Sequence, residues 1–456
     1  MPGKKRVERC VMTFARAWNT LAATRCLGRH GIEVITGDSI PLAGSNFSFY
    51  SKKSFTYPDP DEDPEGFVDK LVEVCEKHGG PDVDLVLMPL HTCSFVIAEH
   101  ADRFEGIAKI ALPSKEGIDT LGNKANLARF AEKHGIHIPK TVVVETVDGI
   151  ADAAEKVEYP AFLKLSDSNA AIGLHKVESP EDAVEKFKRD VKRFGVAGKD
   201  VAIIQEAVPG EDYCSTFLFE RGEIRASMTY HNILEYPKKS GMGALRETVD
   251  ASWMEDIGEE TLAKVEWHGV AEIDFRWDGE NEPYLIEVNP RFWGGLGQSI
   301  ESGVEYPYLL FRLAADGHID PPTREARNVR TVNPCLMVML MLQEFLEAKD
   351  TKTEIKRSFE EFKKDLKKEK DSFKALDRFS DNLAAALNPF DRVKAVEEVL
   401  RQTRGAVDEL FNKRDPLPAL GLLYPLAAFV KKRKISPEAL ITGAAKSTGD
   451  KTKDSN

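Results

Sequence analysis

The first hundred residues of the chain alternate between short apolar runs and stretches with helical spacing. Residues 7–14 form an apolar run of strand length, and residues 64–78 carry apolar side chains at helical spacing. This alternation predicts a parallel sheet with helices on both faces. Ligands of such sheets bind beyond the carboxyl ends of the strands. We expect those ends at residues 14–19, 37–39 and 89–94.

From residue 140 the pattern changes to a series of short strands. Helix-like stretches near residues 180–194 and 254–267 interrupt the series, which predicts an α+β domain. The expected strands lie at residues 141–144, 161–165, 201–206, 213–219, 270–277 and 284–288.

After about residue 322 the composition shifts to charge-rich and amphipathic stretches. Residues 349–374 are a dense run of mixed charge, which is typical of a solvated helix, and residues 446–456 are typical of a disordered tail. We therefore expect three parts: an α/β domain at 1–112, an α+β domain at 113–322, and a mainly helical C-terminal extension at 323–456.

Composition narrows the class of protein. The chain has 63 basic and 75 acidic residues, a net charge of −12, which disfavours non-specific nucleic-acid binding because that needs a cationic surface. The six cysteines are scattered without a CxxC pair, so the sequence predicts neither a zinc ribbon nor a secreted disulfide framework and favours a cytoplasmic protein. No apolar run reaches the roughly 18 residues of a membrane-spanning helix.

Oxygen ligands gather on two consecutive predicted strands. Alternation places Glu287 and Asn289 on one face of the strand at 284–289, and Asp274 on one face of the strand before it. A short turn joins the two strands, so these side chains should line one surface. Carboxylate and amide oxygens suit a hard cation such as Mg²⁺. The alternative is that these side chains form the solvated face of a hairpin and bind no metal.

The run Glu287-Val288-Asn289-Pro290-Arg291 resembles the E-x-N-P-R signature of the ATP-grasp superfamily, which includes carbamoyl-phosphate synthase, biotin carboxylase and many carboxylate–amine ligases. Its continuation to Gly294 is similar to predicted ligases nearest carbamoyl-phosphate synthase. The resemblance covers about residues 112–317 and implies a Rossmann-like pre-ATP-grasp domain followed by a two-lobed ATP-grasp domain. It also implies ATP and Mg²⁺ as cofactors, with Mn²⁺ as a substitute. Asp274, Glu287 and Asn289 would hold the metal, and Arg291 would contact the transferred phosphate.

The same resemblance assigns phosphate contacts to two lysines. Lys124 lies at the start of a predicted helix, and the alternative to a phosphate contact is an exposed lysine on that helix. Lys164 lies in an apolar strand, where an unpaired charge is costly, so a negative partner such as the ATP phosphates is expected. The expected phosphate-covering loop, residues 166–173, contains one glycine, whereas the corresponding loop of the superfamily is rich in glycine.

The adenine and ribose positions follow the strand at residues 201–206. Glu206 and Val208 resemble the superfamily's inter-lobe linker and would frame the base. Either Glu211 or Asp212 would bind the ribose hydroxyls, and the sequence leaves the choice open.

Candidate substrate contacts come from three places. Arg16 and Asn19 lie at a helix start after the first strand, where either anion binding or simple capping is expected. Lys238 and Arg246 lie in a basic segment interpreted as a flexible substrate-side loop, with a solvated loop as the alternative. Trp293 either lines the acceptor pocket or packs beneath it.

Taken together, the sequence predicts an ADP-forming ligase. ATP would phosphorylate a small-molecule carboxylate, and an amine or another nucleophile would attack the acyl phosphate and release phosphate. One alternative is a bicarbonate-activating enzyme of the carbamoyl-phosphate-synthase or carboxylase kind, and another is a non-catalytic ATP-binding protein. The sequence leaves room for a homo-oligomer. An apolar and then basic stretch, residues 417–434, offers peripheral membrane contact, although burial in the helical extension is the preferred expectation.

Overall fold

The computed structural model describes residues 6–166, 173–238, 241–320, 326–347, 357–364, 376, 378–380, 382 and 389–423. The chain forms two compact units. The first comprises Met1–His231, Glu247–Val329 and Leu410–Asn456, and the second comprises Asn232–Arg246 and Arg330–Glu409.

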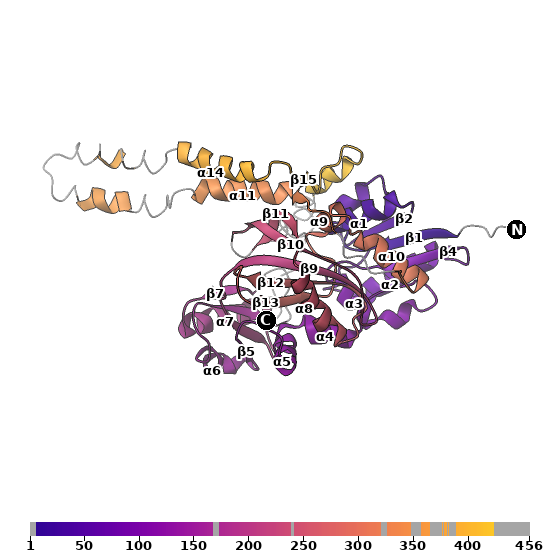
Figure 1. Ribbon diagram of the computed structural model, residues 1–456, viewed down its shortest axis with the longest axis horizontal. Helices are drawn as coiled ribbons and strands as arrows, with labels where there is room; N and C mark the ends of the chain where they lie inside the picture. Colours follow the sequence, from indigo (N-terminus) through magenta and orange to yellow (C-terminus); the bar gives the residue numbers. More distant parts are fainter. Residues whose placement is uncertain are drawn as a thin grey trace, which may run out of the picture. The chain divides into compact units, whose positions relative to one another are not determined.

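The predicted parallel α/β arrangement at the N-terminus is confirmed. Four strands form a sheet in the order β3-β2-β1-β4, and every neighbouring pair is parallel (Figure 1). The chain leaves β1 toward β2 on one side, while β4 pairs with the other side of β1, so the strand order reverses between β1 and β4. Ligands bind at this kind of position in open α/β sheets. The strands are β1 (Val7–Met12), β2 (Glu33–Asp38), β3 (Ser51–Thr56) and β4 (Val83–Met88).

Helix α2 (Pro64–His78) shows how the sequence fixes the local structure of this domain. The Asp63 carboxylate caps the helix by accepting the Gly66 N–H at 2.9 Å, and Pro64 occupies the first turn, where its missing N–H costs nothing. Phe67 and Leu71 lie one turn apart and are fully buried. The remaining helices of this region are α1 (Trp18–Arg29), α3 (Cys93–Glu99), η1 (Gly44–Phe47) and η2 (Ala101–Phe104).

The next part of the first unit contains a four-stranded antiparallel sheet in the order β5-β8-β6-β7. Helix α7 (Pro180–Phe194) packs on it through fully buried Phe187. Ser179 caps α7 by accepting the Asp182 N–H at 3.3 Å. The other elements are β5 (Thr141–Val144), β6 (Ala161–Leu165), β7 (His175–Val177), β8 (Ala202–Glu206), η3 (Val147–Gly149) and α6 (Ile150–Ala154).

The signature run lies in a further sheet, in which the neighbouring strands β13, β12, β9 and β10 pair antiparallel. In it β12 lies between β9 and β13, and β9 also pairs with β10. The strands are β9 (Glu211–Glu220), β10 (Glu223–Tyr236), β12 (Gly269–Trp277) and β13 (Tyr284–Asn289). The helices are α4 (Lys115–Gly122), α5 (Lys124–His134), α8 (Ser252–Ala263), α9 (Leu296–Glu301) and α10 (Tyr306–Asp316). The expected α+β character of this region is therefore confirmed.

Strands β10 and β11 (Met242–Val249) are each divided between the two units. Residues 242–246 were expected in a flexible loop, and this expectation is wrong because Ala244, Leu245 and Arg246 are buried in β11. The rest of the second unit includes β14 (Arg330–Val332), α11 (Pro334–Glu347), α14 (Pro389–Gln402) and β15 (Val407–Asp408). No helix in the described ranges is long and apolar enough to cross a membrane.

The chain returns to the first unit at residue 410, which the sequence did not indicate. Asp415 is fully buried and accepts the Arg25 Nε–H at 2.8 Å. The short helix η4 (Leu417–Leu423) follows. The expected burial of this apolar stretch is wrong for Leu417 and Leu420, whose exposed fractions are 43% and 44%. Residues 424–434 of the expected membrane-contact segment lie outside the described residues.

Candidate active site

The oxygen ligands predicted from strand alternation lie together on the β12–β13 pair. Asp274 pairs with Glu287, and Glu272 pairs with Asn289. The Asn289 Nδ2 amide donates to Asp274 Oδ2 at 3.1 Å and to Glu272 Oε2 at 3.3 Å. Two-residue periodicity and the antiparallel register thus bring three acids and one amide to a single surface.

The two paired carboxylates of this cluster have pKa values shifted in opposite directions. Burial raises the pKa of Asp274 well above its usual range, and the charges of Glu272 and Glu287 raise it further. Burial alone would also raise the pKa of Glu287, but Lys124, Lys164 and Arg291 together lower it. Lys124 Nζ lies 3.8 Å from Glu287 Oε2.

The donor set fits a hard divalent cation. Carboxylate oxygens of Asp274 and Glu287 and the amide oxygen of Asn289 are the ligand types that Mg²⁺ binds. Burial and the neighbouring carboxylates raise the pKa of Asp274, so they disfavour its ionised form. A bound cation would stabilise that negative charge.

Lys164 is buried on β6 next to β8. Its Nζ donates to the Gln205 side-chain oxygen at 2.8 Å. Its hydrogen-bond partner within the described chain is thus a neutral amide. Burial lowers the pKa of Lys164 from its ordinary 10.5 to about 8. A phosphate anion near this amine would restore its charge.

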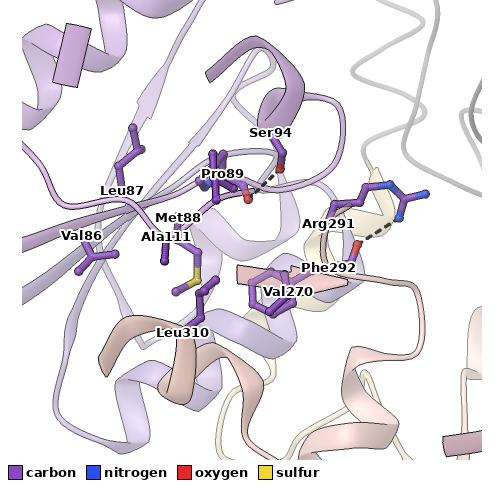
Figure 2. A pocket seen from close by; sticks show the side chains of 11 residues that line it. Val86, Leu87, Met88, Pro89, Ser94, Ala111, Val270, Arg291, Phe292 and Leu310 are labelled. Carbon is purple, nitrogen blue, oxygen red and sulfur yellow. Dashed lines mark hydrogen bonds between the residues drawn. The ribbon is translucent and has the colours of Figure 1, made fainter. Parts of the chain in front are cut away.

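Arg291 lies immediately after β13 and is oriented by two acceptors. Nη2 donates to Asn289 Oδ1 at 3.0 Å, and Nη1 donates to the Phe292 carbonyl at 3.1 Å. Figure 2 shows its guanidinium turned away from an apolar cavity that its stem helps to line. That cavity has a volume of about 10 Å³, at the lower limit for one water molecule, so it is too small for a nucleotide.

The expected adenine linker follows β8. The Glu206 N–H donates to the Lys140 carbonyl at 3.0 Å, and the Glu206 carboxylate lies 3.5 Å from Lys140 Nζ. The Ala207 N–H donates to the Pro160 carbonyl at 3.1 Å. Val208 then lies between β8 and β9, half-buried and outside regular secondary structure.

Both candidate ribose ligands already have basic neighbours. Asp212 forms an ion pair with Arg276, its register partner across β9 and β12. Glu211 lies 3.1 Å from His231 Nε2, and its side chain is 69% exposed. The Asp212 side chain is 27% exposed, so Glu211 is more accessible to a ligand than Asp212. Residues 167–172 of the expected phosphate-covering loop lie outside the described residues.

Arg16 and Asn19 lie at the carboxyl end of β1, as predicted. Arg16 Nε donates to Asp38 Oδ1 at 2.8 Å in a buried ion pair. Asn19 Nδ2 lies 3.5 Å from the Phe292 carbonyl, which links this edge to the residues that follow Arg291. In the described part of the chain, Asn19 Oδ1 is buried without a hydrogen-bond partner.

The other candidate substrate contacts, Trp293, Arg246 and Lys238, make hydrogen bonds or ion pairs with other residues of the chain. Trp293 is fully buried, donates to Ser299 Oγ at 3.3 Å and packs edge-on against Tyr306. It therefore packs in the core, which is the second of its two expected roles. In the second unit, Arg246 is buried against Glu409 with Nη1–O distances of 2.8 and 3.0 Å, and Lys238 forms an ion pair with Glu344.

Two polar residues of the site, Glu272 and Cys214, received no role in the sequence prediction. Glu272 is buried in the acid cluster and also accepts the Tyr230 hydroxyl at 2.6 Å. Cys214 lies opposite Asp274 and approaches its carboxylate at 3.2 Å. Strand alternation already places Glu272 on the same face as Asp274, whereas the position of Cys214 depends on the pairing of β9 with β12.

His91, just beyond β4, was also missed. Its ring stacks on Phe14, which lies just beyond β1, with a centroid distance of 4.4 Å. Both residues have a positive φ of 56°, an uncommon conformation for non-glycine residues. Burial lowers the pKa of His91 to about 3, helped by the positive charges of Arg291 and Arg16. A neutral imidazole therefore lies where the strand order reverses.

Comparison with known protein families gives a match over residues 203–335. The matching family is described as an ATP-grasp in the biosynthetic pathway with Ter operon. The match contains the whole β12–β13 cluster.

Individual relatives match over parts of their length. The chain is 26% identical over 248 residues to urea amidolyase of Lachancea kluyveri, covering 51% of this chain and 13% of that protein. It is 28% identical over 219 residues to D-alanine–D-alanine ligase A of Bradyrhizobium diazoefficiens, covering 42% of this chain and 58% of that one.

A solved structure supports the fold. The biotin carboxylase domain of 2-oxoglutarate carboxylase from Hydrogenobacter thermophilus, in complex with MgADP, ADP and bicarbonate, has a TM-score of 0.57 and 13% identity. The likeness covers 72% of this chain and 75% of that chain. At this identity the likeness concerns the fold alone.

Proposed function

Because the chain belongs to the ATP-grasp superfamily of ligases, we propose that it uses ATP to phosphorylate a small-molecule carboxylate. An amine or another nucleophile then attacks the acyl phosphate, and ADP and phosphate are released. The observation that carries this proposal is the convergence of Asp274, Glu287 and Asn289 on one surface, beside the positive charges of Lys124, Lys164 and Arg291.

In this proposal Asp274, Glu287 and Asn289 hold Mg²⁺, for which Mn²⁺ can substitute. When bound, ATP would supply the phosphoryl group and Mg²⁺ would neutralise its negative charge. Asn289 Oδ1 accepts from Arg291 Nη2 in this structure. If Asn289 held the cation through this oxygen, Arg291 would lose one acceptor and could donate to the transferred phosphate.

Lys164 and Lys124 hold the phosphates in place. Lys164 exchanges the neutral Gln205 amide for a phosphate oxygen, which is a stronger, charge-assisted partner. Glu206 and Val208 frame the adenine, and Glu211 or Asp212 takes the ribose hydroxyls. Fixed positions of this kind are the main catalytic contribution of a protein to phosphoryl transfer.

The acceptor side of the proposed site is the edge where β1 and β4 end. Asn19 Oδ1 is buried and accepts no hydrogen bond from the described residues, so it suits an N–H of an amine substrate. Arg16 is held by Asp38 and contributes positive charge near His91. The division of the chain at residues 112 and 322 into functional domains stays a prediction.

Trapping of the acyl phosphate tests this function directly. We expect hydroxylamine and MgATP to give a hydroxamate with a carboxylate substrate, together with stoichiometric ADP. Asp274→Asn should abolish both products. Asp278→Asn is the matched control, because Asp278 lies in the exposed turn between β12 and β13, outside the cluster. ADP formation that depends on bicarbonate alone would contradict the carboxylate–amine reaction and favour the bicarbonate-activating alternative.

A further inference from the structure

A second group of potential metal ligands lies where α1 meets the start of α10. Cys26 and His30 are four residues apart at the end of α1, so they face the same side. Glu305 is the residue before α10 and makes no side-chain cap to that helix. The thiol, the imidazole and the carboxylate each offer a ligand atom, and these atoms lie within 4.8 Å of one another.

The geometry around Glu305 is well defined. His30 Nε2 lies 2.7 Å from Glu305 Oε2, and Cys26 Sγ lies 3.9 Å from Glu305 Oε1. The His30 ring stacks on Tyr308 of α10 with a centroid distance of 3.8 Å and an interplanar angle of 11°. This stacking holds Nε2 toward the carboxylate. Cys26 is buried, whereas the His30 side chain is 31% exposed, so the group opens to solvent on one side.

We propose that Cys26, His30 and Glu305 bind a borderline-soft divalent cation of the Zn²⁺ class. Zn²⁺ readily combines thiolate, imidazole and carboxylate ligands in a tetrahedral shell, and a water molecule would complete the shell on the solvent side. The Cys26 proton leaves to solvent, and neutral His30 binds through Nε2. One thiolate and one carboxylate then balance the charge of the cation.

The surroundings favour this class of cation over Mg²⁺. Mg²⁺ prefers oxygen ligands and near-octahedral geometry, whereas this group supplies sulfur and nitrogen. The C-terminal end of α1 also carries partial negative charge, which favours cations. The competing positive charge is Arg29, whose Nη2 lies 3.5 Å from Glu305 Oε1. Its side chain is 42% exposed and can turn to water when the cation binds.

Such a cation would connect two parts of the first unit that are far apart in the sequence. Helix α1 is the element after β1, whereas α10 follows the signature strand β13 and helix α9. A metal bound to both would fix α10 against α1 in the folded state. Because an unfolded chain does not hold the three ligands together, binding would stabilise the folded unit. Catalysis by the proposed ligase site is not needed for this role.

Cobalt substitution tests the site without reference to activity. Full-length protein, free of nucleotide and Mg²⁺, is titrated with Co²⁺, and thiolate-to-cobalt charge-transfer absorption is recorded. We expect one Co²⁺ per chain with this band, its loss in Cys26→Ser, and at least tenfold weaker binding in His30→Gln. Cys214→Ser is the matched control, because Cys214, Glu272 and Asp274 form the other potential ligand group found among the described residues. No band in the parent protein, or a band lost in Cys214→Ser but kept in Cys26→Ser, would overturn the assignment.

Thermal unfolding provides the second measurement. Zn²⁺ should raise the melting temperature of the parent protein and of Cys214→Ser, and should leave that of His30→Gln unchanged. His30→Gln retains a hydrogen-bond donor toward Glu305 and is therefore expected to fold. An equal rise in parent and His30→Gln protein would show that His30 is not a ligand.

Discussion

Asp415 of the C-terminal segment makes several buried hydrogen bonds to residues near the N-terminus. Its carboxylate is fully buried and accepts three hydrogen bonds, from Arg25 Nε at 2.8 Å, Ser48 Oγ at 2.8 Å and the Phe49 N–H at 2.9 Å. Arg25 Nη2 also donates to the Asp415 carbonyl at 2.9 Å. Asp415→Ala removes the carboxylate and leaves the buried Arg25 charge without its anionic partner.

The expected cost of Asp415→Ala is large because the pair is buried. Breaking a buried ion pair by removing one partner typically costs about 3–5 kcal/mol. The Arg25 side chain is 8% exposed, so water cannot easily replace the lost carboxylate. Asp69→Ala is the matched control, since the Arg103 and Asp69 side chains are 38% and 66% exposed. An exposed pair of this kind contributes about 0–1 kcal/mol.

Tryptophan fluorescence can follow this effect in urea. All five tryptophans of the sequence, Trp18, Trp253, Trp267, Trp277 and Trp293, belong to the first unit, so their signal reports unfolding of that unit. We expect a clear fall in the urea midpoint for Asp415→Ala and little change for Asp69→Ala. Equal midpoints for the two variants would refute the inference that the Arg25–Asp415 pair holds this segment in place.

Three further predictions follow from the site and the core. Asn289→Ala should reduce Mg²⁺-dependent ADP formation about tenfold or more, equivalent to at least about 1.4 kcal/mol; an unchanged rate in a coupled ADP assay would remove Asn289 from the metal site. Trp293→Ala should cost about 3–5 kcal/mol of unfolding free energy, because a fully buried indole is lost, and circular dichroism in urea would measure this. The pKa of Lys164 is lowered from 10.5 to about 8, so between these values the unfolded chain binds the extra proton, and this residue's contribution to unfolding free energy increases as pH rises. Lys164→Met should flatten that rise in nucleotide-free protein, and identical pH profiles of the two proteins would contradict the lowered pKa.

Local patterns in the sequence predicted much of the fold. Strand length and alternation identified β5 and β6 with their observed bounds. The structure adds a local feature of the same kind at the start of α5, where the Asn123 side chain accepts from the Ala125 and Asn126 N–H groups. The same alternation put Asp274, Glu287 and Asn289 on matching faces. These features depend on neighbouring residues, so a single sequence suffices to predict them.

Features that depend on distant residues were missed or misread. The partner of Arg25 is 390 residues away, and no local pattern indicates that Asp415 returns to it. The basic segment that contains Arg246 was interpreted as a loop. In the structure Arg246 lies in β11 and forms a buried ion pair with Glu409, which is 163 residues away. Cys214 reaches Asp274 through strand pairing across 60 residues. Tertiary pairing, and not local propensity, decides these positions.

Calorimetric titration with nucleotide tests the central proposal most directly. Parent protein should bind ATP much more tightly with Mg²⁺ than without it. Glu287→Gln should lose that dependence on Mg²⁺, because the substitution removes the carboxylate that faces Asp274 across the two strands. Asp278→Asn, in the exposed turn of the same hairpin, should bind as the parent does. Mg²⁺-dependent binding that is equally strong in Glu287→Gln and in the parent, or no ATP binding by the parent, would contradict an ATP site on this surface.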